Sequence, residues 1–119
     1  MKRPQFTFFQ GSTPTLVFAL PYEIADSDVL YATFSQGGCT VTEYTVGGET
    51  YDPAPTGHMV TDAARPQILR IELSQADTFL FQEGDCELQL RVVKSDGRAD
   101  TLFPVRGYVG KAQKGTVIG

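Results

Sequence analysis

The chain has 119 residues and a mass of 13.0 kDa, with 41% hydrophobic and 20% charged residues, which is typical of a single soluble globular domain. Its formal net charge is −4, so it lacks the basic face that a nucleic acid or an anionic membrane surface requires. No apolar run approaches the roughly 20 residues of a membrane helix, and no apolar secretion signal follows the first basic residues. We therefore expect synthesis and folding in the cytoplasm, with neither a nucleic acid nor a membrane as partner.

The first part of the chain alternates apolar and polar residues with a period of two, which predicts β-strands. Leu16, Phe18 and Leu20 share one face of such a segment. The glycine-containing segments 11–14 and 37–38 are typical of tight turns, and each predicts a short antiparallel connection. The strands expected here are residues 5–10, 15–20, 29–34 and 39–46.

Residues 47–66 form one long segment without periodicity, interrupted by several glycines and prolines. A connection of this length inside a small domain is usually functional or mobile. It carries His58, the only histidine, beside Met59.

The clearest alternation follows that segment and predicts strands at residues 68–73, 86–93 and 101–109. Pro104 indicates an edge or bulged position in the last strand, because proline cannot donate to a strand ladder. About seven short strands without an amphipathic helix predict an all-β fold, an antiparallel immunoglobulin-like β-sandwich over residues 1–110. A small barrel is the alternative.

Three carboxylates, Asp77, Glu83 and Asp85, lie between two of these strands. Ser74 followed by Asp77 is a capping pattern, which predicts one short helical turn near Ser74 to Phe79 and a structural role for this corner. A calcium site or acid–base catalysis is the alternative, but the segment lacks the alternating oxygen ligands of a calcium loop.

Cys39 and Cys86 are the only cysteines, 86 − 39 = 47 positions apart. This spacing resembles that of an immunoglobulin disulfide, yet the tryptophan that packs on such a bridge is absent and no export signal is visible. We expect two free, buried thiols, with a disulfide as the alternative. One histidine and two distant cysteines give no zinc spacing, so no metal or other cofactor is expected.

No pattern in the sequence combines a nucleophile, a base and an orienting acid, and no serine lies in a nucleophile-elbow motif. The sequence therefore predicts a non-enzymatic protein with no catalytic residues. Candidate contacts with partners are aromatic or apolar residues outside the expected core. They include two apolar residues of a tail over residues 111–119, which we expect to dock on a partner. The candidates are Tyr44, Tyr51, His58, Met59, Tyr108, Val117 and Ile118.

Several stretches, FFQGSTPTLVFALP, VLYATFSQGG, IELSQADTFLFQEGDCELQLRVVKSDGRA and the final GTVIG, resemble small phage and prophage proteins of Gram-positive bacteria. More remotely, the QGSTP turn is similar to one in the immunoglobulin-like N-terminal domain of phage upper baseplate proteins. In those proteins a stalk follows the domain, whereas this sequence stops at Gly119.

The resemblance implies a virion structural or assembly protein of the tail tip or baseplate, synthesised in the bacterial host cytoplasm. Its partners would be other virion proteins and copies of itself. Capsid decoration, a neck protein, or a carbohydrate-binding module that attaches to a host-surface glycan are the alternatives.

Overall fold

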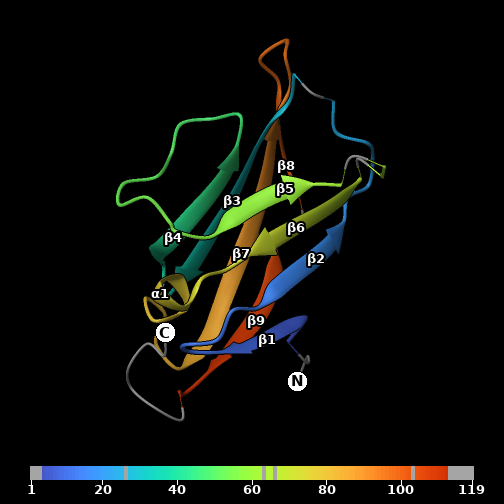
Figure 1. Ribbon diagram of the computed structural model, residues 1–119. Helices are drawn as coiled ribbons and strands as arrows, with labels where there is room; N and C mark the ends of the chain where they lie inside the picture. The colour runs from blue at the N-terminus through green and yellow to red at the C-terminus, as the bar shows by residue number, and fades with distance from the viewer. Residues whose placement is uncertain (1–3, 26, 63, 66, 103, 113–119) are drawn as a thin grey trace.

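The computed structural model describes residues 4–25, 27–62, 64, 65, 67–102 and 104–112. These residues form nine strands and one short helix (Figure 1). In chain order the elements are β1 (Phe6–Phe9), β2 (Thr15–Ala19), β3 (Val29–Gln36), β4 (Cys39–Val46), β5 (His58–Thr61), β6 (Ile68–Glu72), α1 (Gln75–Thr78), β7 (Gly84–Val93), β8 (Ala99–Thr101) and β9 (Val105–Gly110).

The strands form two sheets that pack face to face (Figure 1). The larger sheet has the order β1-β9-β7-β3-β4, with β8 added beside one end of β7, and the smaller sheet has the order β2-β6-β5. Two open sheets in this order, with β4 extending the larger one, are the arrangement of an immunoglobulin-like sandwich. The predicted all-β fold class is confirmed, and the sheets do not close into a barrel.

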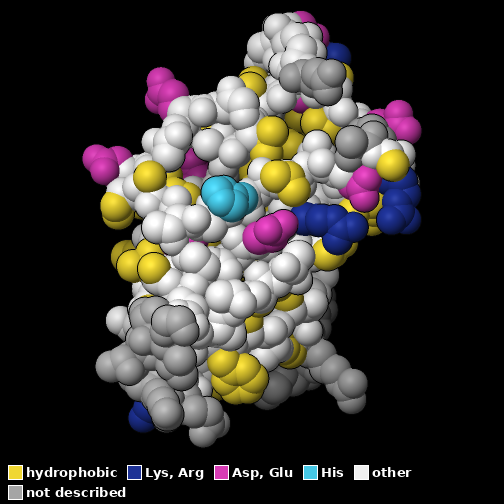
Figure 2. Space-filling view, viewed as in Figure 1, with side chains coloured by type: hydrophobic (Ala, Val, Ile, Leu, Met, Phe, Trp, Pro, Cys, Tyr) yellow, Lys and Arg dark blue, Asp and Glu magenta, His cyan; other side chains and the backbone are white. Residues whose placement is uncertain are grey.

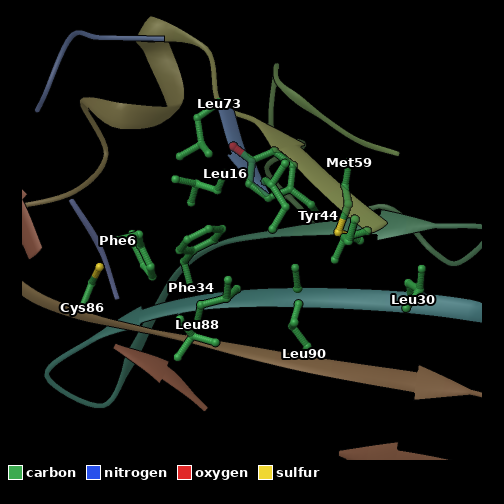
Figure 3. Packing of buried hydrophobic residues seen from close by; sticks show 14 of the residues in the cluster. Phe6, Leu16, Leu30, Phe34, Tyr44, Met59, Leu73, Cys86, Leu88 and Leu90 are labelled. Carbon is green, nitrogen blue, oxygen red and sulfur yellow. The ribbon is translucent and has the colours of Figure 1, made fainter. Parts of the chain in front are cut away.

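The core lies between the two sheets and is filled by the apolar positions of the period-two pattern (Figure 3). The Phe34 ring contacts three other aromatic rings edge to face, with centroid distances of 5.5 to 6.1 Å. Edge-to-face packing suits aromatic rings, whose positive edges meet negative faces. Buried residues from both layers surround this ring, among them Leu69 and Ile71 of β6 and Leu88, Leu90 and Val92 of β7.

The first strand pairs with the last one, and the two run parallel. Phe6 lies opposite Gly107, and a side chain at position 107 would collide with the Phe6 ring. The prediction that residues 11–14 form an antiparallel hairpin is therefore wrong, because β1 belongs to the larger sheet and β2 to the smaller one. The chain crosses between the layers at Gly11, whose φ of 81° is one that glycine adopts readily.

The predicted hairpin at Gly37 and Gly38 is confirmed, since both residues have positive φ and join β3 to β4. A second hairpin, at residues 94–98, turns the chain from β7 into β8. In the second hairpin the Lys94 amide donates to the Arg98 carbonyl over 2.7 Å.

The strand count differs from the expected seven in two places. The segment 47–66 contains β5, which pairs with β6 and was missed because four residues of alternation are too few to stand out. The expected last strand is divided into β8 and β9, which pair with different parts of β7. Pro104 lies between these two strands instead of at an edge or bulged position within one strand, and proline has no amide that could donate to a strand ladder.

Candidate functional site

The acidic corner is built around Asp77, which lies in the predicted helical turn. Helix α1 begins after Ser74, whose hydroxyl oxygen accepts the Asp77 amide over 3.1 Å, as the capping pattern predicts. The Asp77 carboxylate accepts four hydrogen bonds. They come from the Tyr44 hydroxyl at 2.6 Å, the Thr56 amide at 3.0 Å, the Thr56 hydroxyl at 3.3 Å and the Gly57 amide at 2.8 Å.

These hydrogen bonds decide the charge of the corner. Burial favours the protonated form of Asp77, but the hydrogen bonds from Tyr44, Thr56 and Gly57 outweigh it and hold the pKa of the carboxyl below its usual range. Burial, followed by the hydrogen bond to Asp77 and the charge of its carboxylate, raises the pKa of Tyr44. The pair is therefore an ionised carboxylate and a neutral phenol at neutral pH.

The hydrogen bonds of the corner hold separate parts of the chain together. Its carboxylate links β4 and the segment before β5 to the helical turn. Across the described part of the chain, no three His, Cys, Asp or Glu side chains come together in a way that could hold a metal ion.

Three of the four predicted contact residues from the middle of the chain lie near one another. Tyr44, His58 and Met59 line a small hollow of about 280 Å³ between β4 and β5. Tyr44 and Met59 are buried and belong to the core, so they contribute little exposed surface. His58 is exposed at the start of β5, and Tyr51 is half-buried in the preceding loop. Val117 and Ile118 lie outside the described residues.

The outer face of the smaller sheet carries charged and apolar side chains in rows across its strands. His58 lies opposite Glu72, and Val60 lies opposite Arg70. Figure 2 looks onto this face and shows the histidine, an acidic and a basic side chain next to one another. Val17 of β2, opposite Arg70, is 51% exposed and adds an apolar side chain at the sheet edge.

Tyr108 lies elsewhere, on the outer face of the larger sheet. It is 38% exposed and lines an open groove of about 820 Å³ that runs beside the β3–β4 hairpin. Asp85 lies opposite Tyr108, and Glu87 of β7 lies opposite both Arg106 of β9 and Ser35 of β3.

The sequence analysis selected Tyr108 as a contact residue and assigned Asp85 to the acidic corner, but it did not identify Glu87 or Arg106. Asp85 and Glu87 occupy the outward positions of the β7 alternation, and Arg106 and Tyr108 those of β9. Alternation in the sequence indicates that these side chains point outward. Which strands become neighbours, and hence which side chains meet, depends on the pairing of β7 with β3 and β9.

Both cysteines are free, as predicted, but the prediction that both are buried is wrong for Cys39, which is exposed. Cys39 begins β4 and Cys86 lies in β7, with β3 between these strands in one sheet. Strands two apart are separated by roughly 10 Å, beyond the Cα separation that a disulfide spans. Burial, together with the Asp85 charge, raises the pKa of the Cys86 thiol to about 11.

Among the described residues, no helix has the length and apolar character needed to cross a membrane. No protein family and no curated protein matches the sequence.

Several solved structures resemble the fold. CopC from Methylosinus trichosporium OB3b has a TM-score of 0.49 and 14% identity over 89% of this chain and 85% of that one. The V domain of amphioxus IgVJ-C2 has a TM-score of 0.36 and 20% identity over 87% and 98% of the two chains. The first Ig-like domain of human CD48 has a TM-score of 0.41 and 13% identity over 100% and 93%. Because each TM-score is below 0.5, these likenesses carry no inference about activity or partners, and the immunoglobulin-like architecture stands on the strand order given above.

Proposed function

We propose that this domain is a non-enzymatic structural component of a phage particle, bound in the tail tip or baseplate by other virion proteins and by copies of itself. The turn and corner motifs that resemble phage and prophage proteins support this role. So does an Asp77 corner whose polar groups are used for structure. The observation that carries the proposal furthest is the open edge of β2.

Strand β2 lies at one edge of the smaller sheet and pairs only with β6 among the described strands. The Leu20 amide donates to the Gln67 carbonyl, and the Leu73 amide donates to the Pro14 carbonyl. In and beside β2, the backbone groups that point toward β6 are therefore those of the even-numbered residues. Because these groups alternate along a strand, the amides and carbonyls of Thr15, Val17 and Ala19 point away from the sheet.

The edge also lacks the usual protection against pairing. Its five residues, TLVFA, include no charge and no proline, and Val17 is exposed. Natural proteins commonly place lysine, proline or a bulge on an edge strand that stays unpaired. An uncharged edge with free backbone donors and acceptors is suited to strand addition by a neighbouring subunit.

The test introduces a charge at this edge by Val17→Lys and measures incorporation of the tagged protein into purified particles. We expect incorporation to fall at least tenfold while the purified variant keeps its thermal unfolding midpoint. Gln89→Lys is the matched control, because Gln89 is exposed on the interior strand β7 and lies on no edge.

A second variant that lacks residues 111–119 tests the proposed docking tail in the same assay. Loss of incorporation from a folded, truncated protein supports the proposal, and normal incorporation of both variants contradicts it. Immunogold labelling then separates the tail tip or baseplate from a capsid decoration or neck position.

A second candidate function is attachment to a host-surface glycan. The open groove around Tyr108 favours it, because an exposed aromatic ring lies there beside side chains that donate and accept hydrogen bonds.

A further inference from the structure

The groove beside the β3–β4 hairpin has a floor made by outward side chains of neighbouring strands. One row across the sheet consists of Ser35, Glu87 and Arg106, and the next contains Asp85 and Tyr108. Adjacent strands lie about 4.8 Å apart and alternate residues of one strand about 7 Å apart, so these five side chains cover an area comparable to one or two sugar rings. The hairpin residues Gly37 and Gly38 and, on the far side, Pro4 line its margins.

The polar groups of this floor are not used by the protein itself. Across the described residues, no hydrogen bond or ion pair involves the side chains of Asp85, Glu87 or Arg106, although Glu87 and Arg106 are cross-strand neighbours. This contrasts with Asp77, whose carboxylate accepts hydrogen bonds from four donors. A ligand can therefore bind to these donors and acceptors without breaking a hydrogen bond or an ion pair among the described residues.

We propose that this groove binds a short neutral oligosaccharide. Sugar hydroxyls donate to the carboxylates of Asp85 and Glu87 and accept from the Arg106 guanidinium, which carries only donors. The apolar C–H face of a sugar ring packs on the exposed ring of Tyr108. The groove volume, about 820 Å³, lies within the roughly 300 to 1,000 Å³ of small-molecule sites.

Charge selects the class of ligand. Two carboxylates and one guanidinium give the floor a formal charge of 1 − 2 = −1, which disfavours sialylated, sulfated or phosphorylated glycans. A neutral sugar avoids this repulsion, and its hydroxyl groups can donate to the carboxylates and accept from the guanidinium. The inference rests on the second candidate function, the attachment to a glycan, and does not depend on assembly through β2.

The experiment is a glycan array probed with the labelled full chain, followed by amide chemical-shift titration with the neutral oligosaccharide that binds most strongly. We expect saturable binding, with shifts concentrated at residues 35–38, 85–87 and 106–108. Tyr108→Ala should weaken binding at least tenfold, and Glu87→Gln should weaken it several-fold.

Tyr31→Ala is the control. Tyr31 lies on the outer face of the same sheet but does not line the groove, and its ring centroid is 4.9 Å from the guanidinium carbon of Arg91. The substitution should leave binding unchanged, and thermal unfolding verifies that each variant is folded. The inference is overturned by no saturable binding to any neutral glycan, by binding to acidic glycans alone, or by unchanged binding of Tyr108→Ala. None of these outcomes alters the particle-incorporation test, so the two proposals fail separately.

Discussion

The Tyr44 hydroxyl donates a hydrogen bond of 2.6 Å to Oδ2 of Asp77, joining two residues 33 positions apart in a buried contact. Tyr44 belongs to β4 in the larger sheet, and Asp77 belongs to the turn that follows β6 in the smaller sheet. The contact therefore links the two layers at one end of the sandwich, and Thr56 and Gly57 attach the intervening loop to the same carboxylate.

Removal of this contact should destabilise the domain measurably. We expect Tyr44→Phe to lower the free energy of unfolding by about 2 kcal/mol, because a hydrogen bond to a charged group is lost. Asp77→Asn should cost about 3 kcal/mol, since the carboxylate accepts several donors. The double variant should cost less than the sum, because both substitutions remove the same bond. Denaturant unfolding measures each value.

A surface pair provides the control for that series. Tyr22 donates to Asp100 over 3.1 Å at an exposed site, where water replaces a lost partner. Tyr22→Phe should change the free energy of unfolding by less than about 0.5 kcal/mol. An equal loss in Tyr22→Phe and Tyr44→Phe would contradict a special role for the buried contact.

Acid should remove the contribution of Asp77. The pKa of this carboxyl is lower in the folded chain than in the unfolded chain, where it is about 3.9. Its stabilisation is therefore fully present above the unfolded value and is lost as pH falls through the folded value. We expect the difference in unfolding free energy between the natural chain and Asp77→Asn to be constant from about pH 5 to 7 and to shrink below about pH 4. A difference that grows toward acid would refute this sign.

The two thiols should react at very different rates. Cys39 is exposed, whereas Cys86 is buried with a pKa raised to about 11, so little thiolate is accessible at Cys86 near neutral pH. We expect a maleimide to label one cysteine of the folded protein and both in denaturant, with peptide mass spectrometry assigning the first to Cys39. Rapid labelling of Cys86 in the folded protein would show that β7 opens readily.

Thr42 presents a buried polar group without a partner. Its side chain lies in the core opposite Phe34, and its hydroxyl has no hydrogen bond to any described residue. We expect Thr42→Val, which keeps the shape, to raise the free energy of unfolding by about 1 kcal/mol. Thr40→Val on the exposed part of β4 should change it by less than about 0.5 kcal/mol. A loss of stability in Thr42→Val would mean that the hydroxyl is bonded.

Much of the fold could be predicted from local patterns. Alternation identified the long strands because one face of each is buried, and Ser74 with Asp77 identified the helical turn because capping involves residues three apart. The parallel pairing of β1 with β9 could not be predicted in this way. It depends on the fit of Phe6 against Gly107, which are far apart in the chain.

In the candidate sites, too, single exposed residues could be predicted from local patterns, but groups of residues from different strands could not. Tyr108 could be selected because an aromatic residue at an outward strand position is exposed. Tyr44 and Met59 were selected for the same reason, but they point inward and belong to the core. The grouping of Ser35, Glu87 and Arg106 arises only when β3, β7 and β9 align in one sheet.

The parallel contact between β1 and β9 has a consequence during protein synthesis. Phe6 and Phe8 leave the ribosome well before the strand that pairs with them, which contains Val105 to Gly110. While translation continues, these two aromatic side chains lack their final partner and remain open to contacts with other nascent chains. The larger sheet can therefore be completed only after β9 has been synthesised, 107 − 6 = 101 residues after Phe6 for the pair Phe6 and Gly107.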